Sequence, residues 1–215
     1  MAYKFDYTKH KKHPLYKVIK PIAALVIKSK YKVTYIDREN VPTDRGVILA
    51  PNHITALDPV IVGSGCPECE MHFIAKQELF ENAVVGWFLS QLNSFPVNRS
   101  KFDFDAINYA VEIVKSGAAL GIFPEGTRSE NFTPQKGKGG IGYVVRECKC
   151  DVVPVSIYTC DKAKSGTRLT VRYGKPIKYE EFGLDENSTK MKDLRKVSNL
   201  VMERINELWS EGHGD

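Results

Sequence analysis

The sequence predicts an α/β fold in which a mixed, mostly parallel sheet is flanked by helices, with an N-terminal amphipathic helical segment before it. Apolar runs of strand length alternate with amphipathic runs of helix length along the chain. The runs at residues 47–50 and 118–123 are apolar throughout, which is typical of parallel strands covered by helices on both faces. A length of 215 residues, with 42% hydrophobic and 27% charged residues, fits one globular domain.

The first half of the chain begins with a helix over residues 14–30. Its apolar side chains recur at about the i, i+3, i+4, i+7 spacing of a helix, and Pro21 predicts an interruption or a kink. Residues 32–36 alternate between polar and apolar side chains, as a half-buried strand does. The further elements expected in this half are strands at 47–50 and 71–75 and helices at 59–65 and 79–92.

The second half continues the alternation. Residues 104–115 carry apolar side chains on one helix face, and Ser116-Gly117 ends that helix. Pro154 predicts that its strand lies at a sheet edge, at a bulge or at an end facing a site, because proline has no N–H for a ladder. The other elements expected are a strand at 118–123, a helix at 141–148, strands at 152–157 and 169–173, and a terminal helix at 194–209.

The basic charge is confined to the N-terminus. Residues 1–32 hold nine lysines and one acid for a net charge of +8, and the remaining residues are net −3. A nucleic-acid-binding body would carry its basic residues over the fold, so no nucleic-acid partner is expected. No apolar run reaches the length of about 18 residues that indicates a membrane-spanning helix.

The charge pattern divides the chain into a basic amphipathic segment, residues 1–31, and a main domain, residues 32–215. Lysines flank the apolar face of the helix at 14–30, and a basic cluster at residues 9–13 precedes it. Such a helix can lie in the interface of an anionic membrane. The alternative is an amphipathic helix that docks on its own domain with solvated lysines.

The cysteines predict a reduced protein without a metal site. There are five, an odd number, in a chain that shows no signal peptide. The spacing of Cys66-x-x-Cys69 and Cys148-x-Cys150 is poor for zinc.

A histidine and an aspartate mark the junction between the strand at 47–50 and the helix that follows. His53 and Asp58 are five residues apart, so their side chains can meet only if the segment between them is a turn and the helix begins at or near Asp58. A histidine there can act as a general base, and an aspartate can hold its tautomer and stabilise its cation. The alternative reading is a loop histidine beside a helix N-cap, because Pro59 follows Asp58.

Four segments occur in a fixed order: Asn52-His53-x4-Asp58, Phe95-Pro96-Val97-Asn98-Arg99, Phe123-Pro124-Glu125-Gly126-Thr127-Arg128-Ser129 and Val153-Pro154-Val155. Together they resemble the glycerolipid acyltransferase family, most closely the lysophosphatidic acid acyltransferases, over roughly residues 30–180. The resemblance implies a glycerol-phosphate acyltransferase-like fold. It also implies transfer of a fatty acyl group from acyl-CoA or acyl-carrier protein to the sn-2 hydroxyl of lysophosphatidic acid, without a cofactor, on the cytoplasmic face of the cell membrane.

The residue types fit this chemistry. His53 takes the hydroxyl proton and Asp58 orients it, so no serine or cysteine nucleophile is needed. Arg99 and Arg128 can each hold a phosphate, and Gly126 lets backbone N–H groups approach an anion. The resemblance implies that Glu125, Gly126 and Thr127 bind substrate, and Asn52 and Pro154 are expected at the pocket.

Several alternatives stay open. Arg99 and Arg128 would otherwise form surface salt bridges, Glu125 could pair with Arg128, and Lys136 and Lys138 fit a solvated turn. Trp87 and Phe88 are expected in the core and otherwise in a tunnel for the acyl chain. The segment before Arg99 departs from the family pattern, so the acceptor could be another lysophospholipid or lack phosphate. A hydrolase and a non-catalytic lipid-binding membrane adaptor are the other function classes.

Overall fold

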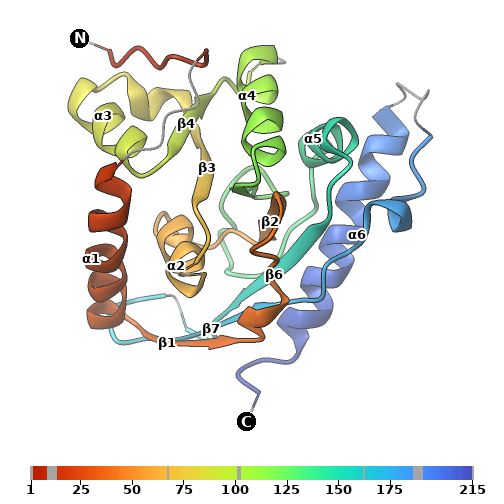
Figure 1. Ribbon diagram of the computed structural model, residues 1–215. Coiled ribbons are helices and arrows are strands. Elements are labelled where there is room, and N and C mark those ends of the chain that lie inside the picture. The colour runs from red at the N-terminus through yellow and green to blue at the C-terminus, as the bar shows by residue number, and fades with distance from the viewer. Residues whose placement is uncertain are drawn as a thin grey trace.

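A computed structural model describes residues 2–8, 14–66, 68–100, 103–161, 163–185 and 191–214, and their strands form one sheet. The strand order is β1-β7-β6-β2-β5-β3-β4 (Figure 1). Only the β6–β7 pair is antiparallel among the described strands, so the predicted mixed, mostly parallel sheet is confirmed. The strands are β1 (Lys32–Ile36), β2 (Val47–Pro51), β3 (Met71–Lys76), β4 (Ser94–Val97), β5 (Ala119–Gly121), β6 (Val152–Tyr158) and β7 (Arg168–Tyr173).

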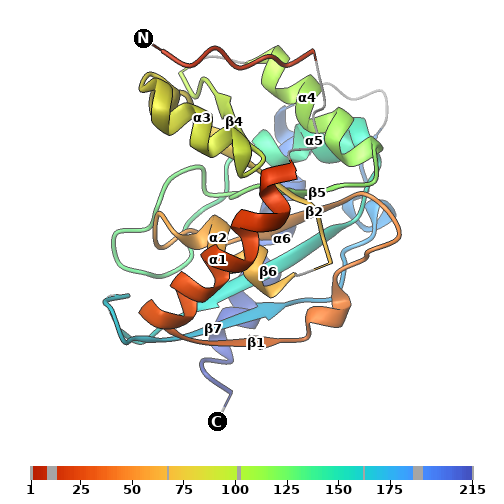
Figure 2. The same ribbon diagram turned by 60° about the vertical axis from the view of Figure 1, so that its left-hand side comes forward.

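Helices cover both faces of the sheet. One face carries α1 (Pro14–Lys30) and α2 (Asp58–Gly65), and the other carries α4 (Phe104–Lys115), α5 (Gly140–Cys148) and α6 (Met191–Ser210) (Figure 1). The remaining helix, α3 (Ala83–Gln91), lies by β4 at the end of the sheet, next to the N-terminal end of α1 (Figures 1 and 2). Three 3₁₀ turns are described at Arg38–Asn40, Gln77–Phe80 and Tyr179–Phe182.

Strand β2 shows why the sheet needs cover on both sides. Val47 and Leu49 point into the core beneath α1 and α2, whereas Ile48 and Ala50 point into the core beneath α4, α5 and α6. This alternation follows from the period of two of a strand. The parallel neighbours of β2 on both sides, β5 and β6, bring the loops after β2 and β5 to one edge of the sheet.

Two helix predictions need correction. The helix expected over residues 79–92 is divided, because Asn82 caps a new helix by accepting hydrogen bonds from the amides of Val84 and Val85. Of the interruption or kink expected at Pro21, the interruption is absent, because α1 continues through this residue. Pro21 and Lys17 are both exposed, so the carbonyl that lacks its helical donor is open to solvent.

The expected position of Pro154 is also corrected. Its strand, β6, lies between β2 and β7 and is not an edge. The carbonyls of Asp151 and Val155 accept hydrogen bonds from β2 and from Asn52 just after it. Because the backbone groups of successive strand residues point to opposite neighbours, the backbone of Pro154 faces β7. The β6–β7 ladder begins only at Val155, and the Pro154 carbonyl accepts from Gly174 just beyond it. The missing N–H of Pro154 therefore removes no hydrogen bond from the β6–β7 ladder.

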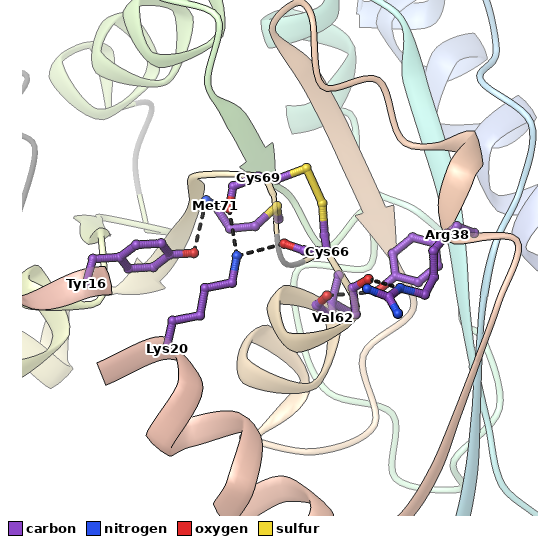
Figure 3. Close-up of a disulfide and its surroundings, with 9 residues drawn as sticks. Tyr16, Lys20, Arg38, Val62, Cys66, Cys69 and Met71 are labelled. Carbon is purple, nitrogen blue, oxygen red and sulfur yellow. Dashed lines mark hydrogen bonds between the residues drawn. A yellow bond between two sulfur atoms is a disulfide. The ribbon is translucent and has the colours of Figure 1, made fainter. Parts of the chain in front are cut away.

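The cysteines differ from the expectation of a fully reduced chain. Cys66 and Cys69 form a disulfide in the turn between α2 and β3 (Figure 3). The C-x-x-C turn brings their Cα atoms to 5.5 Å, a separation that a disulfide can span. Cys148, Cys150 and Cys160 are free thiols.

The N-terminal segment is part of the folded body. The amide of Tyr3 donates to Phe80, the hydroxyl of Tyr7 donates to the Pro96 carbonyl, and the ring of Phe5 packs edge-on against Tyr109. The predicted basic cluster at residues 9–13 lies outside the described residues. No helix in the described part of the chain is long and apolar enough to cross a membrane.

Candidate active site

His53 and Asp58 meet at the end of β2, as the sequence predicts. Residues 52–57 form a turn, α2 begins at Asp58, and Nδ1 of His53 lies 2.7 Å from Oδ2 of Asp58. An ionised carboxylate only accepts hydrogen bonds, so Nδ1 carries the proton and Nε2 keeps its lone pair. The other prediction for this stretch, a loop histidine next to a capping aspartate, does not describe this geometry.

The surroundings of Asp58 hold its carboxylate in place. The side chain is fully buried, and Oδ2 also accepts from the amides of Ile54 at 2.6 Å and Thr55 at 2.8 Å. Oδ1 accepts from the hydroxyl of Thr55 at 2.7 Å. Buried charge is tolerated only when its oxygens are bonded in this way. The turn therefore supplies a fixed acceptor for the imidazole.

The loop after β5 holds the backbone of His53 through two hydrogen bonds. Oε1 of Glu125 accepts from the His53 amide at 2.9 Å, and the Ser129 amide donates to the His53 carbonyl at 2.7 Å. Glu125 is 1% exposed, and no hydrogen bond to its Oε2 is found among the described residues. Burial raises the pKa of Glu125 to about 7, and the bond from His53 opposes that rise. No ion pair joins Glu125 to Arg128 among the described residues, so the structure gives Glu125 a role in positioning His53.

Phe123 supports the imidazole ring. The two rings stack with centroids 4.0 Å apart at an angle of 25°. Together with the bond to Asp58, this contact fixes the plane of the imidazole. The sequence gives no signal for the stacking, because it joins residues that are 70 positions apart.

Arg99 reaches the same loop from the end of β4. Its Nη1 donates to the Gly126 carbonyl at 2.6 Å, and the described residues form no ion pair with it. Gly126 has φ +70°, and a Cβ there would lie 3.1 Å from Cδ of Lys138. Arg128 follows in the loop and is exposed.

A cavity of about 470 Å³ lies next to His53. His53, Phe123 and the cations Lys76, Arg99 and Arg128 lie at the carboxyl end of the strands. Most of the remaining wall is apolar and comes from α1, α2, β3 and α3. The site therefore joins a base and cations to an apolar chamber, which suits a substrate with an anionic head and a long chain.

The other predicted site residues have different places. Thr127 lines the cavity with Arg128. Asn52 is buried, and its side chain exchanges two hydrogen bonds with the backbone of Ile157, at 3.1 and 2.7 Å, which ties the end of β2 to β6. Pro154 packs within β6. The residues that line the cavity do not include Asn52 and Pro154, which were predicted at the pocket, or Glu125 and Gly126, which were predicted to bind substrate.

Trp87 and Phe88 are the clearest error in the sequence-based assignment. The prediction placed them in the core, but they are 49% and 45% exposed, and the cavity takes Leu89 from the same helix and Leu92 from the position just after it. A helix that is apolar on nearly every side gives no sign of which face is inward.

The sequence model of the acyltransferase family matches residues 32–158, which include His53, Asp58, Arg99 and the loop after β5. The chain belongs to the acyltransferase family. This confirms the resemblance that the motifs indicate.

Two relatives of this acyltransferase are 1-acyl-sn-glycerol-3-phosphate acyltransferases. That of Bacillus subtilis is 26% identical over 197 residues, covering 90% of this chain and 96% of the relative. That of Streptococcus pneumoniae is 29% identical over 192 residues, covering 84% and 69%. The 1-acyl-sn-glycerophosphate (LPA) acyltransferase structure from Thermotoga maritima superposes with a TM-score of 0.68 at 23% identity, covering 91% of this chain and 77% of that one. This structural match supports the α/β fold described above.

Proposed function

We propose that this acyltransferase moves a fatty acyl group from acyl-CoA or acyl-carrier protein to the sn-2 hydroxyl of lysophosphatidic acid, which yields phosphatidic acid. The observation that carries the proposal is the His53–Asp58 pair at 2.7 Å, on the wall of a cavity that holds cations at one end and apolar side chains over the rest. The names of the relatives agree with this reaction.

The chemistry follows from the geometry. Nε2 of His53 removes the proton from the acceptor hydroxyl, whose oxygen attacks the thioester carbonyl. Asp58 stabilises the imidazolium that forms. The tetrahedral oxyanion collapses, the carbon–sulfur bond breaks, and the thiolate leaves with the proton that the imidazolium returns. No acyl-enzyme is formed, so no nucleophilic side chain is required.

The cations supply the recognition of the acceptor. The guanidinium of Arg99 uses one nitrogen on Gly126 and keeps its other donors for a phosphate, and Arg128 lies beside it on the cavity wall. Phosphate recognition separates lysophosphatidic acid from an acceptor that lacks phosphate.

Attachment to an anionic membrane belongs to the same proposal. On α1, Leu15, Val18, Ile22, Leu25 and Val26 are all exposed, whereas Ile27 on the opposite side is buried in the core. Val84, Trp87 and Phe88 expose a second apolar surface on α3, next to α1 (Figure 2). Contiguous exposed apolar faces flanked by lysines are typical of proteins that lie on membranes. The enzyme would be peripheral, with the cytoplasmic leaflet as its substrate reservoir.

The test mixes the protein with lysophosphatidic acid and either a long-chain acyl-CoA or an acyl-carrier protein, and detects phosphatidic acid by mass spectrometry. His53→Ala should lose at least ~100-fold in kcat, which is the usual contribution of a general base. Lysophosphatidylcholine and monoacylglycerol serve as competing acceptors, and a reaction without acceptor measures hydrolysis. Product from a correctly folded His53→Ala variant at the wild-type rate would refute the assignment of the base.

A further inference from the structure

A thiol and an imidazole meet outside the cavity, where the end of β6 lies beside the end of the chain. Cys160 is exposed and lies two residues past the end of β6. Nε2 of His213, which follows α6, lies 3.6 Å from the Sγ of Cys160. Nδ1 of the same ring lies 2.9 Å from the hydroxyl of Thr170 on β7. A nucleophile, a base and a group that orients the base are therefore in contact.

The position of His213 is built into the fold. Arg172 of β7 is buried, and its Nη1 donates to the Gly212 carbonyl at 2.6 Å. Its Nε lies 2.9 Å from Oε2 of Glu211, so one buried guanidinium holds two positions of the segment after α6. The ring of Tyr158 meets the imidazole edge-on, with centroids 4.8 Å apart. These contacts present the imidazole to the thiol.

The hydrogen bonds of the imidazole suit both of its protonation states. A neutral ring can accept the thiol proton at Nε2, and the imidazolium that results donates from both nitrogens, to the thiolate and to Thr170. A hydroxyl both donates and accepts, so Thr170 fits either form. The thiolate is the nucleophilic form of cysteine, which this arrangement favours at Cys160. The half-buried thiol of Cys148 is directed instead to the Val111 carbonyl, at 3.9 Å.

The loop that carries Cys160 lies at the end of α1. The amide of Gly166 in this loop donates to the Lys30 carbonyl at 2.7 Å (Figures 1 and 2). Lys28 in the last turn of α1 and Lys164 in the loop are both exposed. Exposed ammonium groups attract phosphates, and coenzyme A carries several. The surroundings of the thiol therefore suit an acyl-CoA.

We propose that Cys160 is a site of S-acylation, at which its thiol takes the acyl group of acyl-CoA with His213 as the base. Nε2 of His213 takes the thiol proton, and the sulfur attacks the thioester carbonyl. The carbon–sulfur bond to coenzyme A then breaks, and the departing thiolate takes the proton back from the imidazolium. A thioester on Cys160 remains. The inference rests on the proposed function for its donor, but it uses neither His53 nor lysophosphatidic acid.

An acyl chain at this position would strengthen attachment to a membrane. One acyl chain alone gives marginal, reversible binding, and stable attachment takes a second signal. The exposed apolar stripe of α1 is such a signal, and the loop of Cys160 lies at the end of the same helix.

The experiment incubates the protein with palmitoyl-CoA, without acceptor, and follows the acyl group by intact-protein mass spectrometry. A His53→Ala background removes the base of the cavity. One acyl group should be added, and neutral hydroxylamine should release it, because hydroxylamine cleaves thioesters. Cys160→Ser should stay unmodified. Cys148→Ser is the matched control, because it removes another free thiol, and it should be acylated at the rate of the background.

A second variant tests the base while it keeps the thiol. His213→Gln should slow acylation of Cys160 by about tenfold or more, because a cysteine by itself is only a few per cent thiolate near pH 7. Its melting temperature shows that the fold is retained. Acylation of this variant at the full rate, or of Cys160→Ser to the same extent, would overturn the inference.

Two further measurements separate this inference from the proposed function. A wild type that forms phosphatidic acid but carries no acyl group on Cys160 would overturn the inference alone. A wild type that is acylated there but forms no phosphatidic acid would overturn the proposed function alone. In vesicle sedimentation at high salt, the acylated wild type should stay bound, whereas Cys160→Ser treated in the same way should dissociate. Equal release of the two proteins would overturn the role of the acyl group in attachment.

Discussion

Glu125 shows how a single buried carboxylate can hold the backbone of His53 without lining the cavity. Oε1 accepts a hydrogen bond from the His53 amide, and Oε2 has no partner in the described part of the chain, at a site that is 1% exposed. Desolvation opposes ionisation, which explains a pKa of about 7. The carboxyl is thus half-protonated near neutrality, and the folded protein binds its proton more tightly than the unfolded chain does.

This difference predicts how stability depends on pH. The pKa rises from 4.5 in the unfolded chain to about 7 in the folded protein, so the free energy of unfolding should fall as pH rises between these values. The contribution of Glu125 to that fall is about 3 kcal/mol, at about 1.4 kcal/mol per pKa unit. Glu125→Gln keeps an acceptor for His53 and should remove this part of the slope. Denaturant unfolding at a series of pH values measures it.

Glu130→Gln provides the control for the pH experiment. Glu130 is exposed in the same loop, so its replacement should leave the wild-type slope unchanged. Parallel stability profiles for wild type and Glu125→Gln would show that Glu125 titrates at its ordinary pKa and that burial does not govern it.

The residues of the site divide into those that a sequence can reveal and those that it cannot. His53 and Asp58 are five positions apart, so local turn geometry is enough to predict their contact. Asn52 and Glu125 belong to recognisable motifs, but their side chains face the backbone of distant strands and loops. Phe123 and Ser129 act on His53 through contacts across the sheet edge, and no periodicity records such pairs.

At the scale of elements, periodicity predicts the strands and helices well and their orientation less well. Most strands and helices begin and end close to the expected residues because hydrophobic spacing is strong there. On α1, however, one apolar stripe contains Val18, Ile22 and Leu25 and another contains Ile19, Ala23 and Ile27. Only the packing shows that the first faces outward and the second faces the protein.

The exposed face of α3 leads to a prediction about membrane contact. Trp87 and Trp209 are the two tryptophans of the chain. In a Trp209→Phe background, the emission of Trp87 should shift to shorter wavelength when anionic phospholipid vesicles are added, because an exposed indole moves from water into lipid. In the reciprocal Trp87→Phe background, Trp209 packs against Tyr158 and should not respond.

Sedimentation with the vesicles establishes that both proteins are bound. If Trp87 keeps its emission in a protein that sediments with vesicles, α3 does not enter the lipid interface, and α1 alone would provide the attachment.

At the scale of the whole molecule, the N-terminal segment cannot be treated as a detachable anchor. Residues 2–8 pack on the body through Tyr3, Phe5 and Tyr7, and α1 supplies Tyr16, Lys20 and Ala23 to the cavity wall. The predicted division between residues 1–31 and 32–215 follows the charge of the chain, but charge does not report these packing contacts. Under the proposed attachment to a membrane, α1 combines anchoring with formation of the cavity wall.

Two changes to this segment should therefore have different effects. Deleting residues 1–30 should abolish vesicle binding, lower the melting temperature and remove most transfer to a water-soluble short-chain acceptor, because the cavity loses a wall. The triple variant Val18→Ser, Ile22→Ser and Leu25→Ser changes side chains that are 58%, 57% and 68% exposed. Exposed substitutions usually change stability by at most ~0.5 kcal/mol each, so this variant should stay folded and active on the soluble acceptor while vesicle binding falls. Full activity of the deleted protein on the soluble acceptor would show that α1 is an anchor alone and that the chamber along α2 is complete without it.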